Sequence, residues 1–311
     1  MKAVVTGGAG FIGSHLVEGL LERGYRVAVL DDLSTGKLAN ISHLVEAKRI
    51  EFHKGSILDD ELLARVFNDT EFVFHEAALA RVPRSVAQPL EANEINITGT
   101  LKVLLAARDS GVRKLVFASS SSVYGDSNVM PQHEGLIPSP LSPYALNKLA
   151  GEHYCSIFKG IYGLDTVALR YFNVYGRRQD LESQYSTVIP AFVDRISRGE
   201  APVIYGDGEQ TRDFTFVADV VRANILAAES EASGVYNIGS GRSVSINRLA
   251  ADIARLMGKD IKPVHQPPRP GDPRHTLSDI SRAAGFGYKP GWSLEEGLKD
   301  IINSAAKQWN R

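Results

Sequence analysis

Tyr144 and Lys148 stand four residues apart, and in a helix this spacing would place their side chains on one face. A tyrosine phenol has a pKa of about 10, which is too high for a base at neutral pH. A neighbouring cation stabilises the phenolate and lowers that pKa. The pair therefore predicts a tyrosine base whose pKa is lowered by Lys148. The same spacing also occurs on solvated helices, where it has no chemical role.

Four consecutive serines, Ser119 to Ser122, follow the apolar run 115–117. If that run is a strand, the serines lie at its carboxyl end, where open α/β sheets bind their ligands. The hydroxyl of Ser120 is thus a candidate to hydrogen-bond a reacting oxygen, and the alternative role for these serines is loop capping. None has the G-x-S-x-G setting of a hydrolase nucleophile.

Glycines recur at Gly7, Gly10 and Gly13, between an apolar run at residues 4–5 and a helical pattern. In this strand–turn–helix setting, glycine permits a tight turn and close approach to a pyrophosphate, whose charge a helix N-terminus favours. Asp31 ends the next apolar run, eighteen residues after Gly13. A carboxylate there accepts from adenosine ribose hydroxyls and repels a 2′-phosphate. The pattern predicts that NAD is bound rather than NADP. The alternative for the glycines is a plain strand-to-helix turn, and the alternative for Asp31 is a helix cap.

Short apolar runs alternate with longer helical patterns through the first half of the chain, as in parallel βαβ units. The expected strands are residues 4–5, 27–30, 50–52, 72–74 and 115–117, and the expected helices are 12–22, 60–67 and 90–110. We therefore predict an α/β protein with a Rossmann-type, doubly wound parallel sheet.

After about residue 177 the sequence is richer in polar loops with glycine and proline. This change predicts an NAD-binding Rossmann domain over residues 1–176 and a smaller, loop-rich substrate domain over residues 177–311. Further helical and strand patterns predict that a segment around residues 215–240 returns to the first sheet.

The composition excludes several classes of protein. The chain has 311 residues, and its 35 Lys and Arg against 36 Asp and Glu give a net charge of −1, so no global field attracts nucleic acid or an anionic membrane. No run approaches the ~20 apolar residues of a membrane-spanning helix. The single Cys155 excludes an internal disulfide, and the eight histidines form no H-E-x-x-H pair. We expect a cytoplasmic protein that binds no metal, nucleic acid or membrane.

Together these motifs resemble the extended short-chain dehydrogenase/reductase family, and within it the nucleotide-sugar 4-epimerases that act on UDP-glucose or UDP-N-acetylglucosamine. The resemblance extends to about residue 302 and rests on Thr6 to Gly13, Asp31, Ser120, Tyr144-x-x-x-Lys148 and Arg170 to Asn173. It implies that Tyr144 is the catalytic base, that Lys148 holds the nicotinamide ribose and tunes the phenol, and that Ser120 assists at the sugar 4-OH. The implied NAD site comprises Gly7, Gly10, Phe11, Ile12, Gly13, Asp31, Ser56, Ile57, Ala77, Asn96, Tyr144, Lys148 and Tyr171.

The resemblance also implies a UDP-sugar pocket in the second half of the chain. Asn173, Arg212 and Arg269 occupy the diphosphate positions, and arginine suits them through bidentate contacts. Tyr205 corresponds to the aromatic residue beside the uracil, and Asp272 to the acceptor for the uridine ribose. The implied substrate residues are Ser120, Tyr144, Asn173, Val188, Tyr205, Arg212, Arg269, Asp272 and Thr276.

Some positions depart from the family pattern. Ser56 stands where many relatives carry an aspartate near the adenine, and Ala80 where many glucose-type epimerases carry a lysine. Residues 77–85 are instead similar to the subgroup active on N-acetylated sugars. Thr276 stands where a bulky tyrosine would exclude an N-acetyl group, so we expect both kinds of hexose to be accepted. The alternative is that Thr276 faces solvent.

The resemblance implies NAD-dependent epimerisation at C4 of a UDP-hexose through a 4-keto sugar, with UDP-Glc, UDP-Gal, UDP-GlcNAc and UDP-GalNAc as substrates. The rivals of the same fold are a 4,6-dehydratase and a UDP-glucuronate decarboxylase or epimerase. Dehydratases and decarboxylases place acids just after the catalytic hydroxyl, where this chain has Ser121 and Ser122. A non-catalytic NAD-sensing protein usually lacks the tyrosine or lysine. The family's four-helix interface implies a homodimer through residues 90–110 and 142–162.

Overall fold

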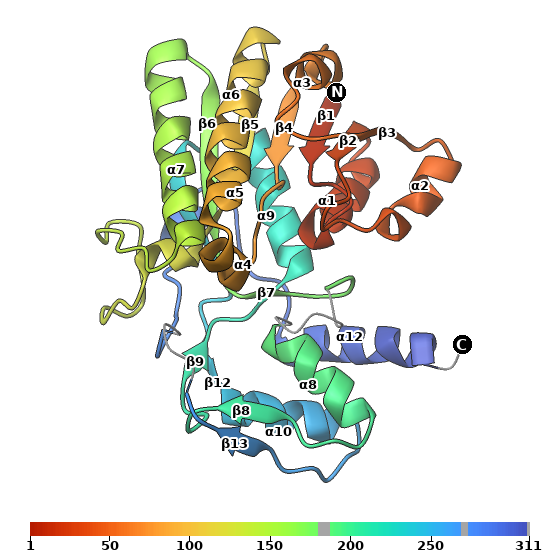
Figure 1. Ribbon diagram of the computed structural model, residues 1–311, viewed down its shortest axis with the longest axis vertical. Helices are drawn as coiled ribbons and strands as arrows, with labels where there is room; N and C mark the ends of the chain where they lie inside the picture. The colour runs from red at the N-terminus through yellow and green to blue at the C-terminus, as the bar shows by residue number, and fades with distance from the viewer. Residues whose placement is uncertain (180–186, 269–272, 310–311) are drawn as a thin grey trace.

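A seven-stranded sheet forms the larger lobe of the computed structural model, which describes residues 1–179, 187–268 and 273–309 (Figure 1). The strand order is β11-β6-β5-β4-β1-β2-β3, and every neighbouring pair is parallel. The strands are β1 (Lys2–Thr6), β2 (Arg26–Asp31), β3 (Ile50–Lys54), β4 (Phe72–His75), β5 (Lys114–Ser120), β6 (Asp165–Tyr171) and β11 (Gly234–Ile238). The expected Rossmann-type, doubly wound parallel sheet is confirmed.

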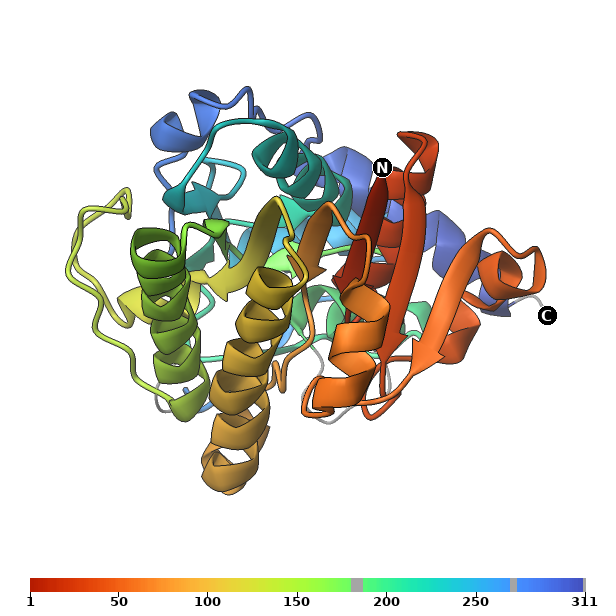
Figure 2. The ribbon, with the colours of Figure 1, turned by 90° about the horizontal axis from the view of Figure 1, so that it is seen from above.

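Helices cover both faces of this sheet (Figure 2). One face carries α1 (Phe11–Glu22), α2 (Ser42–Glu46), α9 (Val217–Glu229) and α11 (Ser281–Ala284), and the other carries α3 (Asp60–Phe67), α6 (Gly99–Asp109) and α7 (Pro143–Tyr162). Because both faces are covered, central strands are apolar without alternation, and all four residues of β4 are buried.

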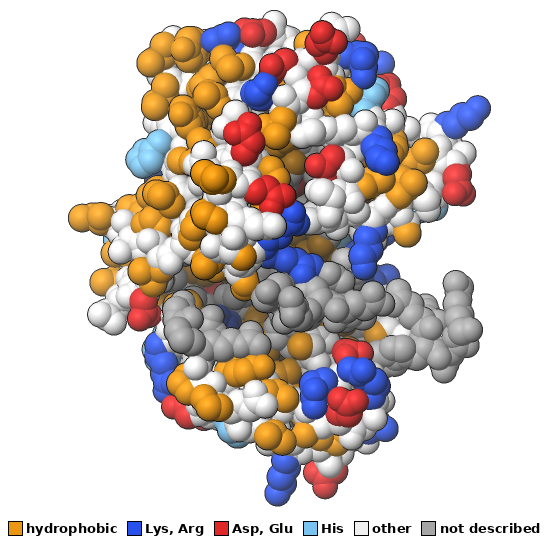
Figure 3. Space-filling view, viewed as in Figure 1, with side chains coloured by type: hydrophobic (Ala, Val, Ile, Leu, Met, Phe, Trp, Pro, Cys, Tyr) orange, Lys and Arg blue, Asp and Glu red, His pale blue; other side chains and the backbone are white. Residues whose placement is uncertain are grey.

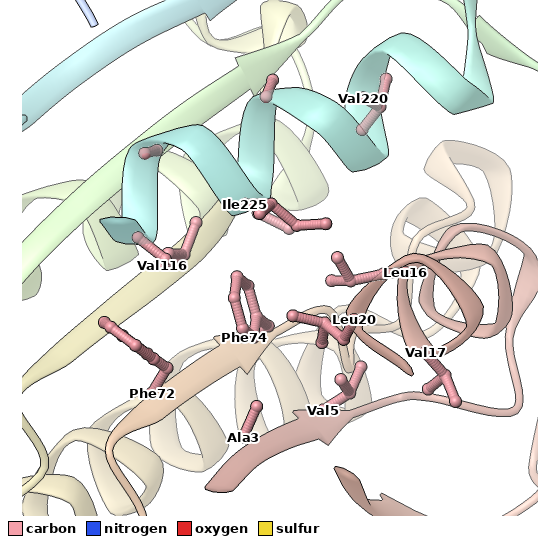
Figure 4. Close-up of a cluster of buried hydrophobic side chains, with 14 of the residues drawn as sticks. Ala3, Val5, Leu16, Val17, Leu20, Phe72, Phe74, Val116, Val220 and Ile225 are labelled. Atoms are coloured by element: carbon pink, nitrogen blue, oxygen red, sulfur yellow. The ribbon is translucent and has the colours of Figure 1, made fainter. Parts of the chain in front are cut away.

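The core between α1, α9 and the sheet fixes the strands that lead into the site. Leu20, Phe74 and Ile225 converge there from three different elements (Figure 4). Burial of each such side chain contributes roughly 1.5–3 kcal/mol. The carboxyl ends of β1 and β4 are therefore held at fixed positions.

Helix α7, which carries Tyr144 and Lys148, has a strong cap at each end. The Ser142 hydroxyl accepts from Ala145 N at 3.2 Å, and Pro143 takes the first helical position. Gly163 ends the helix in the left-handed conformation, with φ of 72°. These caps set the start and the end of the helix.

The helix expected over residues 90–110 is interrupted. Helix α5 (Pro89–Asn93) leads into a π-helical turn (Glu94–Thr98) before α6 begins. Within the turn, Asn96 Oδ1 accepts from Leu79 N at 2.8 Å and Asn96 Nδ2 donates to Leu79 O at 3.1 Å. The expectation of one regular helix is thus wrong in this turn, because a distant loop engages Asn96; π turns are frequent near functional sites.

The smaller lobe has its own core, in which Phe192, Ile204 and Leu249 are buried. Its helices are α8 (Val188–Ser197), α10 (Ile246–Leu256) and α12 (Leu294–Trp309), and its paired strands are β7 (Val174–Tyr175) with β10 (Thr215–Phe216), β8 (Val203–Tyr205) with β13 (Val264–Gln266) and β9 (Thr211–Arg212) with β12 (Val244–Ser245). Between these segments the chain returns to the larger lobe as α9 and β11. Within the described residues, no helix is long and apolar enough to cross a membrane.

Candidate active site

The turn between β1 and α1 is built for close approach of another molecule. Gly7 has φ of 71°, and a Cβ on Gly13 would come within 2.2 Å of Gly7 O. Gly10 is the N-cap of α1, and because glycine has no side chain it cannot cap the amide groups of the first turn. This N-terminus suits a pyrophosphate. The residues present, including Phe11 and Ile12 in that turn, fit the phosphates of a dinucleotide.

Asp31, at the end of β2, is bound to the glycine turn. Its Oδ2 accepts from Ala9 N at 2.9 Å, and its Oδ1 accepts from Leu33 N at 2.8 Å. Burial raises the pKa of this carboxyl, and the two amide hydrogen bonds lower it. Each carboxylate oxygen retains a further acceptor site, so the expected contact with ribose hydroxyls stays a prediction. Asp31 also positions the turn, and it caps no helix.

The other expected cofactor residues line the same edge of the sheet. Gly55 N donates to Asp31 O at 3.1 Å, which places Ser56 and Ile57 beside Asp31. A Cβ on Gly7 would lie 2.7 Å from Ala77 N, so Ala77 contacts the glycine turn. Their roles, like those of Asn96 and Tyr171, remain predictions.

Tyr144 and Ser120 meet across α7 and β5. Ser120 ends β5, and its hydroxyl lies close enough to the Tyr144 phenol to lower the pKa of that phenol. The Ser120 hydroxyl also accepts from Ser122 N at 3.2 Å and from Ser122 Oγ at 2.9 Å. Lys148, one turn along α7, is buried, and its Nζ donates to Ala118 O at 2.6 Å. The structure thus brings the three expected catalytic residues together.

Lys148 is not among the groups that shift the pKa of Tyr144 in the protein without bound ligands, so its expected effect on the phenol stays a prediction. Burial raises the pKa of Tyr144 to about 12; a hydrogen bond from Ser120 lowers it and the charge of Glu76 raises it. Lys148 Nζ lies 5.9 Å from the centroid of the Tyr144 ring and binds a carbonyl oxygen instead. Burial is therefore the largest influence on the pKa of Tyr144.

Glu76 is a site residue that the sequence motifs missed. It directly follows β4, and Tyr171 donates its hydroxyl to Glu76 Oε1 at 2.7 Å. Burial raises the pKa of Glu76, whereas Tyr171 and Lys148 lower it. An acid directly after a buried apolar run is the same signal that identified Asp31, so position alone indicated Glu76.

A cavity of about 280 Å³ in the smaller lobe brings together four expected substrate residues. They are Asn173, Val188, Tyr205 and Arg212. Arg212 Nη1 donates to Thr211 O at 2.9 Å, which fixes the guanidinium at the cavity wall. Arg269 and Asp272 lie outside the described residues, so their roles stay predictions.

Thr276 is buried and hydrogen-bonds Asn173, a residue of the cavity wall. Its hydroxyl accepts from Asp213 N at 3.1 Å and donates to Asn173 Oδ1 at 3.2 Å. Asn173 has φ of 25°, an uncommon conformation for a residue with a side chain. The alternative that Thr276 faces solvent is therefore wrong.

Comparison with known proteins agrees with this geometry. A UDP-N-acetylglucosamine 4-epimerase from Methanobrevibacter ruminantium M1, solved with UDP-N-acetylmuramic acid, is 44% identical with a TM-score of 0.96, covering 99% of this chain and 98% of that chain. A UDP-glucose 4-epimerase from Thermotoga maritima, solved with UDP-glucose, is 43% identical with a TM-score of 0.95, covering 99% and 100%. A putative UDP-glucose 4-epimerase from Methanocaldococcus jannaschii is 40% identical over 96% of this chain and 97% of its own. Residues 3–239 match the model of the NAD dependent epimerase/dehydratase family. This protein accordingly belongs to that family and uses NAD as its cofactor.

Proposed function

We propose that the chain is a UDP-hexose 4-epimerase. The observation that carries the proposal is the continuity between the reactive cluster and the cavity at the end of β6. Tyr171 hydrogen-bonds Glu76 beside the catalytic residues, and Asn173, two residues later, lines the cavity. A nucleotide bound in the cavity can thus present its sugar to Tyr144.

Each residue then has a defined task. The phenolate of Tyr144 takes the proton of the sugar 4-OH, and Ser120 donates a hydrogen bond that stabilises the phenolate. NAD held at the glycine turn and beside Lys148 would supply a hydride acceptor for C4 and the means to return that hydride to the opposite face of the sugar. Arg212 and Asn173 hold the diphosphate while the sugar turns, so that the keto sugar is not released.

The rivals of the same fold fit the site less well. A dehydratase or decarboxylase needs an acid next to Ser120, and Ser121 and Ser122 occupy that place. Glu76 is an acid in the site, but it accepts from Tyr171 on β6. A non-catalytic NAD sensor does not need the hydrogen bond between Ser120 and Tyr144.

The assay that tests the proposal uses purified protein without added cofactor. UDP-Glc is incubated with the protein, and the products are separated chromatographically. We expect UDP-Gal at equilibrium and no net NADH. A 4-keto-6-deoxy sugar, a pentose or stoichiometric NADH would contradict the proposal.

We also propose that N-acetylated hexoses are substrates, because Thr276 is small and adjoins the cavity residue Asn173. Thr276→Tyr should lower kcat/KM selectively for UDP-GlcNAc and UDP-GalNAc, since overfilling a packed site is costly. Thr276→Ser, which retains the hydroxyl, is the control and should retain all four activities. Equal losses on both sugar pairs, or a wild type inactive on the N-acetylated pair, would contradict this.

We further propose a homodimer through α5 and α7. Leu90 on α5 is 87% exposed, and Leu146, Ile157 and Ile161 on α7 are 54%, 45% and 71% exposed. The three α7 residues share one helix face. Figure 3 shows hydrophobic side chains gathered where Figure 1 places α7. A second copy of the chain would cover this face.

A further inference from the structure

Glu76 is a carboxylate to which the proposed reaction gives no task, although it lies among the residues that carry that reaction. Its backbone N–H donates to Thr6 O at 3.1 Å, which holds it at the edge of β1. Tyr171 donates to its Oε1 at 2.7 Å and accepts from Asn224 Nδ2 at 2.8 Å. A Cβ on Gly7 would approach the Glu76 carbonyl carbon to 3.0 Å. Glu76 is thus fixed between the glycine turn and β6.

The charges that face Glu76 come from α7. Lys148 lowers the pKa of Glu76, and Glu76 raises the pKa of Lys148 and of Tyr144. The adjacent His75 is buried with its pKa lowered to about 3, so it is neutral at physiological pH. Tyr171 from β6 is also neutral there, because burial raises its pKa. Glu76 and Lys148 are therefore the acid and the ammonium of this cluster whose charges interact, while Lys148 Nζ donates to Ala118 O.

We propose that the Glu76 carboxylate is the counter-ion of the oxidised nicotinamide and makes bound NAD harder to reduce, an inference that rests on the proposed function. Three expected cofactor residues lie around Glu76. Ala77 follows it in the chain, the Tyr171 hydroxyl donates to its carboxylate, and the charge of Lys148 lowers its pKa. The oxidised ring is a cation and the reduced ring is neutral. A fixed negative charge away from water therefore stabilises the oxidised form.

This bias serves an epimerase in particular. The enzyme must return the hydride that it removes. If the keto sugar dissociates before that return, the cofactor stays reduced and the enzyme is inactive. A cofactor that is harder to reduce favours the return step. Glu76 would therefore protect each turnover without touching the sugar.

The test compares holoenzymes of the wild type, Glu76→Gln and Glu71→Gln. Glutamine at position 76 keeps the volume and the oxygen that accepts from Tyr171, and it removes only the charge. Glu71 precedes the opposite end of β4, where it pairs with Arg113 at 2.8 Å, so its substitution is the matched control. Each protein is equilibrated with a redox dye of known potential, and bound NADH is read by absorbance.

We expect the equilibrium constant for reduction to rise on the order of ten-fold in Glu76→Gln, equivalent to about 30 mV for two electrons, and to stay unchanged in Glu71→Gln. Removal of the negative charge should also shift the limb of the activity profile that rises with pH to lower pH, because the pKa of the base Tyr144 falls. Equal reduction constants in wild type and Glu76→Gln would overturn the inference and leave the epimerase proposal standing. A wild type that binds NAD but interconverts no UDP-sugar would instead overturn the proposed function.

If Glu76→Gln does not fold, the pH dependence of the NAD reduction potential in the wild type tests the inference instead. Lowering the pH protonates Glu76, so the potential of bound NAD should rise more steeply with acidity than that of free NAD. Parallel dependences would overturn the inference.

Discussion

Tyr144, Glu76 and His75 lie at one edge of the sheet, and burial is the largest influence on the pKa of each. It raises the pKa of the phenol and the carboxyl and lowers that of the imidazole, since the charged form is disfavoured each time. Without bound ligands, Tyr144 is thus protonated at neutral pH. If Tyr144 is the base, the positive charge of the oxidised nicotinamide is the group that would lower its pKa, because the diphosphate of a UDP-sugar is negative and would raise it.

Tyr144→Phe should lower turnover by ~10²–10⁴-fold while NAD binding is retained, because only the phenol oxygen that moves the proton is lost. Steady-state kinetics and a cofactor titration check this. Tyr162→Phe, at the far end of the same helix, is the control and should be fully active. A near-normal rate in Tyr144→Phe would refute the role of the phenol as base.

His75 should make the protein sensitive to acid. Its Nδ1 lies 2.7 Å from Thr6 Oγ1 and its Nε2 lies 3.0 Å from Thr100 Oγ1, and its pKa is lowered from 6.5 to about 3. The folded-state pKa is depressed, so the stabilisation is present above pH 6.5 and is lost as pH falls towards 3. Urea unfolding over this range should show a steeper decline for wild type than for His75→Gln. Equal slopes would show that His75 does not cause the loss.

Helix α7 is joined to the sheet by a buried ion pair. Arg170 on β6 donates to Glu152 at 2.9 and 2.7 Å, and the Ser119 hydroxyl donates to the same carboxylate at 2.5 Å. Both charged side chains are only 4% exposed. One turn of helix separates Glu152 from Lys148, so this pair positions α7 relative to β5 and β6.

Glu152→Gln should destabilise the fold by about 3–5 kcal/mol, because the buried guanidinium of Arg170 loses its matching charge. Chemical denaturation monitored by circular dichroism measures the change. Glu91→Gln removes a partly exposed partner of Arg84 at 2.8 Å, and this control should cost only about 0–1 kcal/mol. Similar losses of unfolding free energy for both variants would mean that the buried ion pair stabilises the fold no more than the exposed one.

Local patterns were enough to predict most of the larger lobe. The helix at 60–67 and the apolar strands depend on nearby residues, and the glycine turn depends on its own backbone. The π turn escaped prediction because Asn96 bonds Leu79, a contact between segments that no periodicity reveals. The position of Glu76 directly after an apolar run was a signal that the motifs passed over, but its contacts with Tyr171 and Lys148 on other elements could not be predicted from local pattern.

In the smaller lobe, the resemblance to a family predicted residues that hydrophobic patterning alone could not have predicted. Val188, Tyr205 and Arg212 were expected from resemblance alone, and the fold brings them to one cavity. Their convergence depends on short strand pairs between distant segments, such as β8 with β13. Hydrophobic patterning could not specify those pairings.

Association of two whole molecules should depend on the exposed face of α7. Ile161→Glu would place a charge in the proposed dimer interface and should yield monomers, whereas the wild type should have the mass of a dimer in light scattering at micromolar concentration. Val264→Glu alters a residue of similar type that is 50% exposed on β13 in the other lobe, and it should remain dimeric. A monomeric wild type would contradict the proposed dimer.

The position of β11 at the edge of the sheet has a consequence for biosynthesis. β6 pairs with β5 on one side and with β11 on the other, with Val235 opposite Ala168. The ribosome makes β11 only after all the elements from β7 to α9, a delay on the order of seconds after β6. Throughout that interval the nascent chain presents an apolar strand with unpaired amides, which is a template for aggregation. A chain arrested before residue 234 should therefore bind chaperones, and release of the full length should end that dependence.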